Sequence, residues 1–234
     1  MLLGIKSRRM VLLRYVVVGV FAGISFYMGW WLNSTWSADM RLWKSFGVGT
    51  FALLWFTAVI GPAAVVWSPL MTVVTWRRET GVWFVVMGMV HGYLVWDGWA
   101  RWDVASLLGF RYAPELEIYL RAEPGFGLAN LMGIVALGLG LSLAATSFDK
   151  AVSFLGISTW KWLHTFTYVI FYVAVLHAIY FAFIHYTPSP ERPGAVYPAN
   201  PLRFVYVGAL LSVALAQAAA FFRILSRRRA VGAQ

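Results

Sequence analysis

Apolar residues gather in six long runs along the chain, separated by shorter segments that hold most of the charged and proline residues. A helix needs about 20 residues to cross the hydrocarbon core of a bilayer, and each run has about that length. The pattern therefore predicts six transmembrane helices in one all-α domain, residues 1–234. Their expected ranges are 11–32, 47–67, 80–99, 127–146, 162–185 and 204–224.

Composition supports a membrane protein. Hydrophobic residues make up 61% of the chain and charged residues 12%, with a mean hydropathy of +0.71. A soluble domain is about half apolar and about a quarter charged. The chain has no cysteine, so disulfides, thiolate metal sites and a cysteine nucleophile are excluded. We therefore expect a polytopic bundle that contacts membrane lipid, and the first apolar run is interpreted as a retained helix rather than a cleaved signal peptide.

The net charge of +10 is unevenly distributed. If the six spans alternate, most basic residues outside the apolar runs fall on one side, which predicts cytoplasmic termini in a bacterial inner membrane. The same clustering argues against a nucleic-acid-binding face. The residues on this side are Lys6, Arg8, Arg9, Arg77, Arg78, Lys150, Lys161, Arg223, Arg227, Arg228 and Arg229.

The opposite side receives three connecting segments, 33–46, 100–126 and 186–203. In the second, Glu115, Glu117 and Glu123 are expected to cap or surround a short interfacial helix. This acidic segment is interpreted either as a solvated loop or as a docking surface for a periplasmic partner. The third contains TPSPERPGAVYPANP, and its prolines predict an irregular loop.

Two histidines fall at matching depths in different predicted helices. His91 lies thirteen residues after Arg78, and His177 lies thirteen residues after His164, which is close to the inner face. A rise of 1.5 Å per residue places both about 20 Å from the inner boundary. Ionisable residues inside a membrane are costly and usually functional.

Paired imidazoles from facing helices are the ligands that bis-histidine haem requires. Small residues beside each ligand would leave room for the macrocycle. The alternative is that each histidine bonds to a neighbouring helix. The small residues are Gly88 and Gly92 beside His91, and Ala174 and Ala178 beside His177.

His164 lies about 140° around an ideal helix from His177, so the two share a face only if the helix is bulged, kinked or tilted. The third helix offers Arg77 and Arg78 at that depth, and no histidine. The inner end is therefore expected to hold either a second, more labile haem or a headgroup, quinone or flavin (FMN) bound by the arginines. His185 is interpreted as an interfacial or solvent-exposed residue.

Two segments, TWRRETGVWFVVMGMVHGYLV and TSFDKAVSFLGISTWKWLHTFTYVIFYVAVLHAIYF, carry a resemblance. Between about Gly49 and Phe181 the chain resembles the bacterial ferric reductase-like transmembrane domain. Within that superfamily it is most similar to the haem-binding membrane subunit of the periplasmic methionine sulfoxide reductase system. The resemblance implies a six-helix b-type cytochrome in which His91, His164 and His177 occupy haem-ligand positions and electrons pass to the outer side.

The related NADPH oxidases and eukaryotic ferric reductases carry two histidines on the third helix and append a cytoplasmic FAD/NAD(P)H domain. This chain has one histidine there and ends soon after its last span, so the resemblance implies quinol or a separate flavoprotein as donor. The expected acceptor is a periplasmic redox protein. The protein would then be an electron-transfer subunit rather than a complete enzyme. The alternative is a non-redox accessory or assembly subunit that keeps the same fold.

Overall fold

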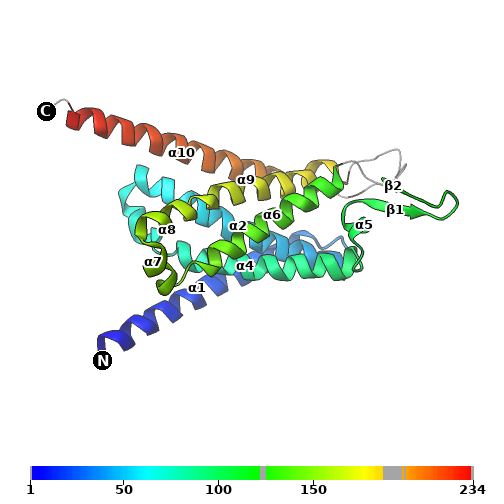
Figure 1. The fold of residues 1–234 in the computed structure, drawn as a ribbon, viewed down its shortest axis with the longest axis horizontal. Helices are drawn as coiled ribbons and strands as arrows, with labels where there is room; N and C mark the ends of the chain where they lie inside the picture. Colours follow the sequence, from blue (N-terminus) through cyan, green and yellow to red (C-terminus); the bar gives the residue numbers. More distant parts are fainter. Residues whose placement is uncertain (1, 122–124, 187–196, 198, 233–234) are drawn as a thin grey trace.

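The computed structural model describes residues 2–121, 125–186, 197 and 199–232, and it is mostly helical (Figure 1). Among these residues, five helical segments are long and apolar enough to cross a membrane. They are Arg9–Leu32 within α1 (Leu2–Leu32), α2 (Ala38–Val66), α6 (Phe126–Ala145), Ile157–Ile184, and Arg203–Ala230 within α10 (Arg203–Gly232). An all-α multi-pass membrane protein is thus confirmed.

The segment Ile157–Ile184 is not one regular helix. It consists of α8 (Ile157–His164), α9 (Phe166–Ile179) and a π-helix, η3 (Tyr180–Ile184). The amide of Thr165 donates to the Trp162 carbonyl, and the amide of Tyr168 donates to the Thr165 carbonyl. These two bonds span three residues rather than the four of an α-helix, so the helix is wound more tightly between α8 and α9. A further π-helix, η2 (Val95–Trp99), continues α4 (Arg77–Leu94).

The third predicted span corresponds to α4 and η2. The first three residues of α4 are Arg77, Arg78 and Glu79, so its 18 residues are less apolar than the five segments above. It nevertheless packs extensively against α2 and also contacts α6 and α1. Four of its apolar or small residues, Phe84, Val85, Met87 and Gly88, are buried.

The long helices run roughly along the long axis of the molecule, and the start of α1 and the end of α10 lie at the same end of it (Figure 1). We call this the termini end and the opposite one the hairpin end. Helix α2 is central, because it contacts α1, α4, α9 and α10, while α6 packs mainly against α9. Large buried side chains from α2 and α9, among them Leu53, Leu54 and Phe171, form the core between these helices.

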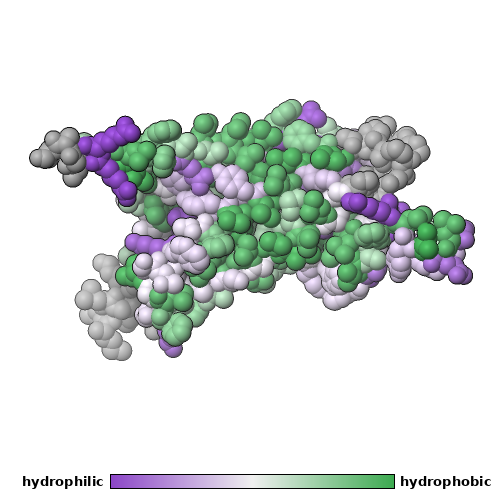
Figure 2. Space-filling model, turned by 45° about the horizontal axis from the view of Figure 1, so that its top comes forward, coloured by the Kyte–Doolittle hydropathy of each residue, from purple (hydrophilic) through white to green (hydrophobic). Residues whose placement is uncertain are grey.

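Apolar side chains also cover the outside of the bundle, and hydrophilic ones gather toward its two ends (Figure 2). Exposed residues such as Leu12, Leu128 and Leu215 belong to α1, α6 and α10. Monomeric soluble proteins rarely expose such a continuous apolar surface. This distribution is the one expected of helices that face lipid.

At the termini end, short helices connect the long ones. The 3₁₀-helix η1 (Ser68–Leu70) and α3 (Met71–Val74) join α2 to α4, and α7 (Asp149–Leu155) joins α6 to α8. Gly156, between α7 and α8, has a φ of 75°, a left-handed value that glycine adopts without strain.

The hairpin end differs from the prediction. After α5 (Val104–Leu107), strands β1 (Phe110–Ala113) and β2 (Ile118–Arg121) pair antiparallel, with Phe110 opposite Arg121 and Ala113 opposite Ile118. The short interfacial helix expected around Glu115 and Glu117 is therefore wrong, and Glu123 lies outside the described residues. Aromatic and β-branched side chains favour strands, and the four residues Pro114–Glu117 form the turn.

The loop expected at 33–46 is also shorter than predicted, because α2 begins at Ala38. Asp39 lies in its first turn, where a negative charge interacts favourably with the helix dipole. Most of the predicted proline-rich loop falls on residues 187–196 and 198, which lie outside the described part of the chain.

Candidate functional site

A cavity of about 420 Å³ lies among α2, α4, α6 and α9. His91 of α4 and His177 of α9 both line it, so the two histidines predicted to lie at one depth do meet at one space. Its walls are mostly apolar, and its volume is within the range of about 300–1,000 Å³ typical of ligand and cofactor sites. The small residues expected beside the ligands also line it, namely Gly88, Gly92, Ala174 and Ala178.

The ring of His91 is oriented by the backbone of α2. Its Nδ1 lies 2.9 Å from the carbonyl oxygen of Trp43. A carbonyl oxygen only accepts, so a neutral ring carries its hydrogen on Nδ1 and keeps a lone pair on Nε2. One turn further along α2, a Cβ on Gly47 would lie 3.3 Å from His91 Cε1, so glycine lets the ring lie close against the helix.

The ring of His177 is held in the same way by α6. Its Nδ1 lies 2.7 Å from the carbonyl oxygen of Ala129. A Cβ on Gly133, one turn further along, would lie 3.1 Å from both Nδ1 and Cε1 of His177. Among the described residues, Nε2 of neither histidine has a hydrogen-bond partner. Each ring is therefore prepared to bind a metal through Nε2.

The two histidine environments correspond at a constant offset. Trp43 and Ala129, Gly47 and Gly133, and His91 and His177 are each 86 positions apart. Helices α2 and α6 both run from the hairpin end toward the termini end, and α4 and α9 both run back (Figure 1). Two helix pairs, α2 with α4 and α6 with α9, thus present one histidine each to the cavity.

A π-helix follows each histidine. The amide of Ala100 bonds to the Val95 carbonyl at 2.9 Å, and the amide of His185 bonds to the Tyr180 carbonyl at 3.0 Å, so both bonds span five residues. Such π-turns are frequent at functional sites. They lie at the hairpin end of the cavity, where Trp99 and His185 also line its wall.

His185 is buried rather than solvent-exposed. Its side chain is 3% exposed, so the expectation of a solvent-exposed histidine is wrong. The ring centroid lies 5.1 Å from those of Phe126 and Phe181 and 6.2 Å from that of Trp99. No pattern in the sequence indicates this burial, because the extra residue of the π-turn changes the direction of every later side chain.

His164 lies away from the cavity and does not line it. Its ring centroid is 4.1 Å from that of Trp160, and its Nε2 is 3.5 Å from Thr146 Oγ1. It is the last residue of α8, directly before the break at Thr165. The chain is thus interrupted between His164 and His177, which is the condition for the two to share a face, but only His177 lines the cavity.

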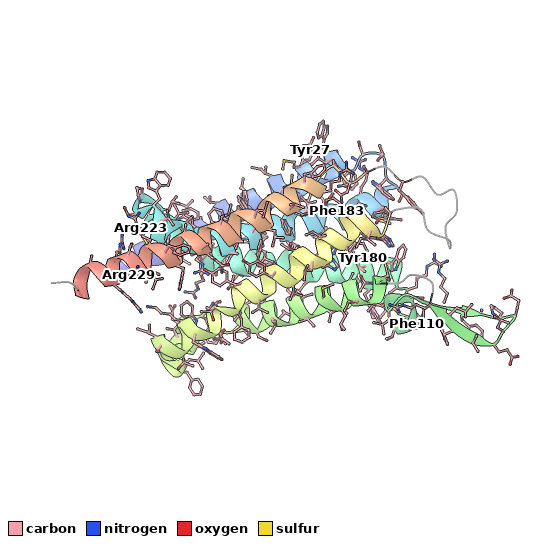
Figure 3. All side chains as sticks on the ribbon, turned by 90° about the horizontal axis from the view of Figure 1, so that it is seen from above. Tyr27, Phe110, Tyr180, Phe183, Arg223 and Arg229 are labelled. Carbon is pink, nitrogen blue, oxygen red and sulfur yellow. The ribbon has the colours of Figure 1, made fainter. Side chains whose placement is uncertain are left out.

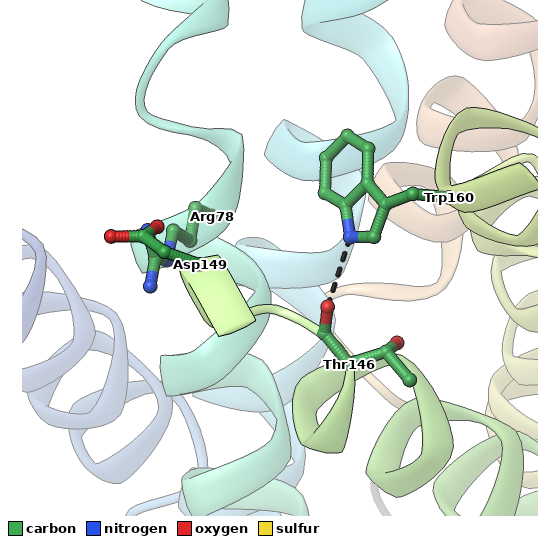
Figure 4. Close-up of polar contacts among 4 residues, drawn as sticks. All are labelled: Arg78, Thr146, Asp149 and Trp160. Carbon is green, nitrogen blue, oxygen red and sulfur yellow. Dashed lines mark hydrogen bonds and ion pairs between the residues drawn. The ribbon is translucent and has the colours of Figure 1, made fainter. Parts of the chain in front are cut away.

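The two arginines beside it have separate partners. Arg77 Nε donates to the Thr57 carbonyl at 3.0 Å, which points this side chain toward α2. Arg78 Nη1 forms an exposed ion pair with Asp149 Oδ1 at 2.9 Å (Figure 4). Figure 4 also shows the indole of Trp160, which donates to the Thr146 carbonyl at 2.9 Å. Arg78 therefore fixes α7 at the surface rather than facing His164.

The donor set suits a metal that already has other ligands. Within the described ranges, no group of three or more histidine, aspartate or glutamate side chains could hold a metal ion. Two imidazoles are the protein ligands of bis-histidine haem, in which the macrocycle would supply the other four donors. The free Nε2 atoms, the small residues and the apolar walls fit such a group.

No protein-family model, no curated protein and no solved structure matches the chain. The resemblance to the ferric reductase-like domain stays a prediction.

Proposed function

We propose that the chain is a b-type cytochrome subunit that binds haem b between His91 and His177. The observation that supports this most strongly is the pair of Nδ1 contacts to the carbonyl oxygens of Trp43 and Ala129. Hydrogen bonds of this kind fix the tautomer and increase the basicity of the ligating nitrogen. Bound haem would supply one-electron transfer, and the chain would contribute two neutral imidazoles and an apolar shell.

We propose six spans, namely the five apolar segments together with α4 and its continuation η2. Both termini would then lie in the cytoplasm of a bacterial cell. Basic residues at the termini end, among them Arg223 and Arg229, support this orientation under the positive-inside rule (Figure 3). Phe110 of the hairpin and Tyr180 of η3 lie toward the other end in the same view. The cavity would then lie in the periplasmic half, close to a periplasmic redox protein as acceptor, and quinol or a flavoprotein would donate from the cytoplasmic side.

We expect purified protein to show a low-spin b-type absorption spectrum that sharpens on dithionite reduction, because two imidazoles make the iron six-coordinate. The measurement is the oxidised and reduced spectrum of protein from haem-replete cells. A colourless preparation would contradict the proposal and favour the second candidate, a non-redox accessory subunit with the same fold. The cavity and its two oriented imidazoles favour the redox function, since a purely structural bundle does not require them.

The number of haems depends on His164. A second haem would have to bind at the termini end, where His164 lies beside Trp160 and Thr146. With a second haem, pyridine haemochrome analysis should give about two haems per chain in the wild type and one in His164→Ala. A ratio of one in both proteins would contradict the inner haem and leave this end, with Arg77 and Tyr168, to a quinone or flavin headgroup.

A further inference from the structure

A cation lies in the wall of the cavity. Lys44 of α2 is the only lysine or arginine among the described residues that line it, and none of them is an aspartate or glutamate. Its Nζ lies 4.4 Å from the centre of the Trp36 ring and 4.3 Å from that of Tyr186. Cation–π contacts hold the ammonium at this point but leave its hydrogen-bonding capacity for another acceptor.

Lys44 and the His91 site lie on one face of α2. Lys44 comes directly after Trp43, whose carbonyl binds His91, and three residues before Gly47, which His91 packs against. Residues three apart lie on the same face of a helix. Because α2 starts at the hairpin end, Lys44 is about one helical turn, about 5 Å, closer to that end than Gly47.

Among the described residues, the ammonium of Lys44 has no carboxylate partner. Among the described residues, the only ion pair is that between Arg78 and Asp149, at the termini end. A charged amine in an apolar cavity is costly unless an anion or polar ligand binds it. Asn33, Asn130 and Asn200 also line the wall, and the side-chain amides of Asn33 and Asn130 already donate to the carbonyls of Gly29 and Leu107, at 2.8 Å and 2.7 Å.

We propose that Lys44 binds a carboxylate of the ligand in this cavity, which is a haem propionate if the proposed function holds. The flat apolar part of the ligand then contacts Gly88, Leu137 and Ala178, and its anionic edge faces the hairpin end. This inference rests on the proposed function. It specifies the orientation of the haem in the cavity, because the propionates would point toward the hairpin end, the side from which electrons would leave.

A comparison of haemin with haemin dimethyl ester tests the contact between Lys44 and a propionate independently of haem binding itself, because the ester has no free carboxylate. Full-length protein from haem-limited cells would be titrated with each compound in detergent. We expect the wild type to bind haemin about ten-fold or more tightly than the ester, the size of one charge-assisted hydrogen bond. Lys44→Met should bind the two equally, whereas Lys44→Arg should keep the preference.

Lys161→Met is the matched control, because Lys161 is an exposed lysine of α8 outside the cavity. It should behave as the wild type does. Lys44→Gln, with circular dichroism and gel filtration, replaces Lys44→Met if the latter does not fold. A haemin preference that persists in Lys44→Met and Lys44→Gln overturns the role of Lys44 and leaves haem binding intact. Failure of the wild type to bind either compound overturns the proposed function and this inference together.

Discussion

Alanine at His91 or at His177 is expected to abolish the low-spin haem spectrum of the protein. Each imidazole would supply one of two axial bonds, and each ring is oriented by a single carbonyl contact, to Trp43 or Ala129. Loss of either leaves a five-coordinate, weakly held haem. Haem per chain by pyridine haemochrome and the reduced spectrum measure the effect, and added imidazole should partly restore the spectrum by entering the vacated space.

His185→Phe is the matched control, because it removes an imidazole from the same cavity wall while keeping an aromatic ring among Phe126 and Phe181. The six-coordinate spectrum should persist in this variant. If His185→Phe loses the spectrum and His177→Ala keeps it, the ligand assigned to α9 is wrong, and His185 takes its place.

The second prediction concerns Gly133. Valine at this position is expected to lower haem content more than ten-fold, because even its Cβ would lie 3.1 Å from Nδ1 and Cε1 of His177, and two methyl groups extend beyond it. The ring must then move away from the Ala129 carbonyl. Protein interiors are densely packed, so the His177 ring cannot shift without losing the orientation in which its Nε2 would bind the iron.

Gly138→Val provides the comparison on the same helix. A Cβ at Gly138 meets nothing within 4 Å, so this variant carries the same change in helix propensity without a contact to His177. It should keep wild-type haem content. Equal haem in the two variants would show that the close approach of His177 to α6 does not matter for binding, whatever their thermal stabilities.

The sequence predicts the bundle well where one physical effect dominates. Burial in lipid requires about 20 apolar residues per span, which places the long helices correctly. The depth of His91 and His177 follows from helical rise alone, and both line one cavity. The start of α2 was missed because Asp39, Arg41 and Lys44 dilute the apolar run, and this error concealed Lys44 as a wall residue.

Other parts of the site depend on contacts that no local pattern shows. The hairpin was missed because three glutamates suggested a helix, although FRYA and IYLR have strand-forming side chains. The roles of Gly47 and Gly133 emerge only when their partner helices are known. His185 is buried by a π-turn, whose single extra residue has no recognisable signature in one sequence.

The constant offset of 86 residues between the two histidine environments has a consequence for the ancestry of the chain. Tandem duplication of a gene segment encoding two helices would leave this offset in three pairs of positions at once. Two-fold symmetric homodimers are the commonest protein oligomers, and an isolated ancestral unit could have paired with a second copy in this way. Each copy would have contributed one imidazole to a flat ligand on the symmetry axis. At the same offset the counterpart of Lys44 is Asn130, so the two halves of the cavity differ in charge.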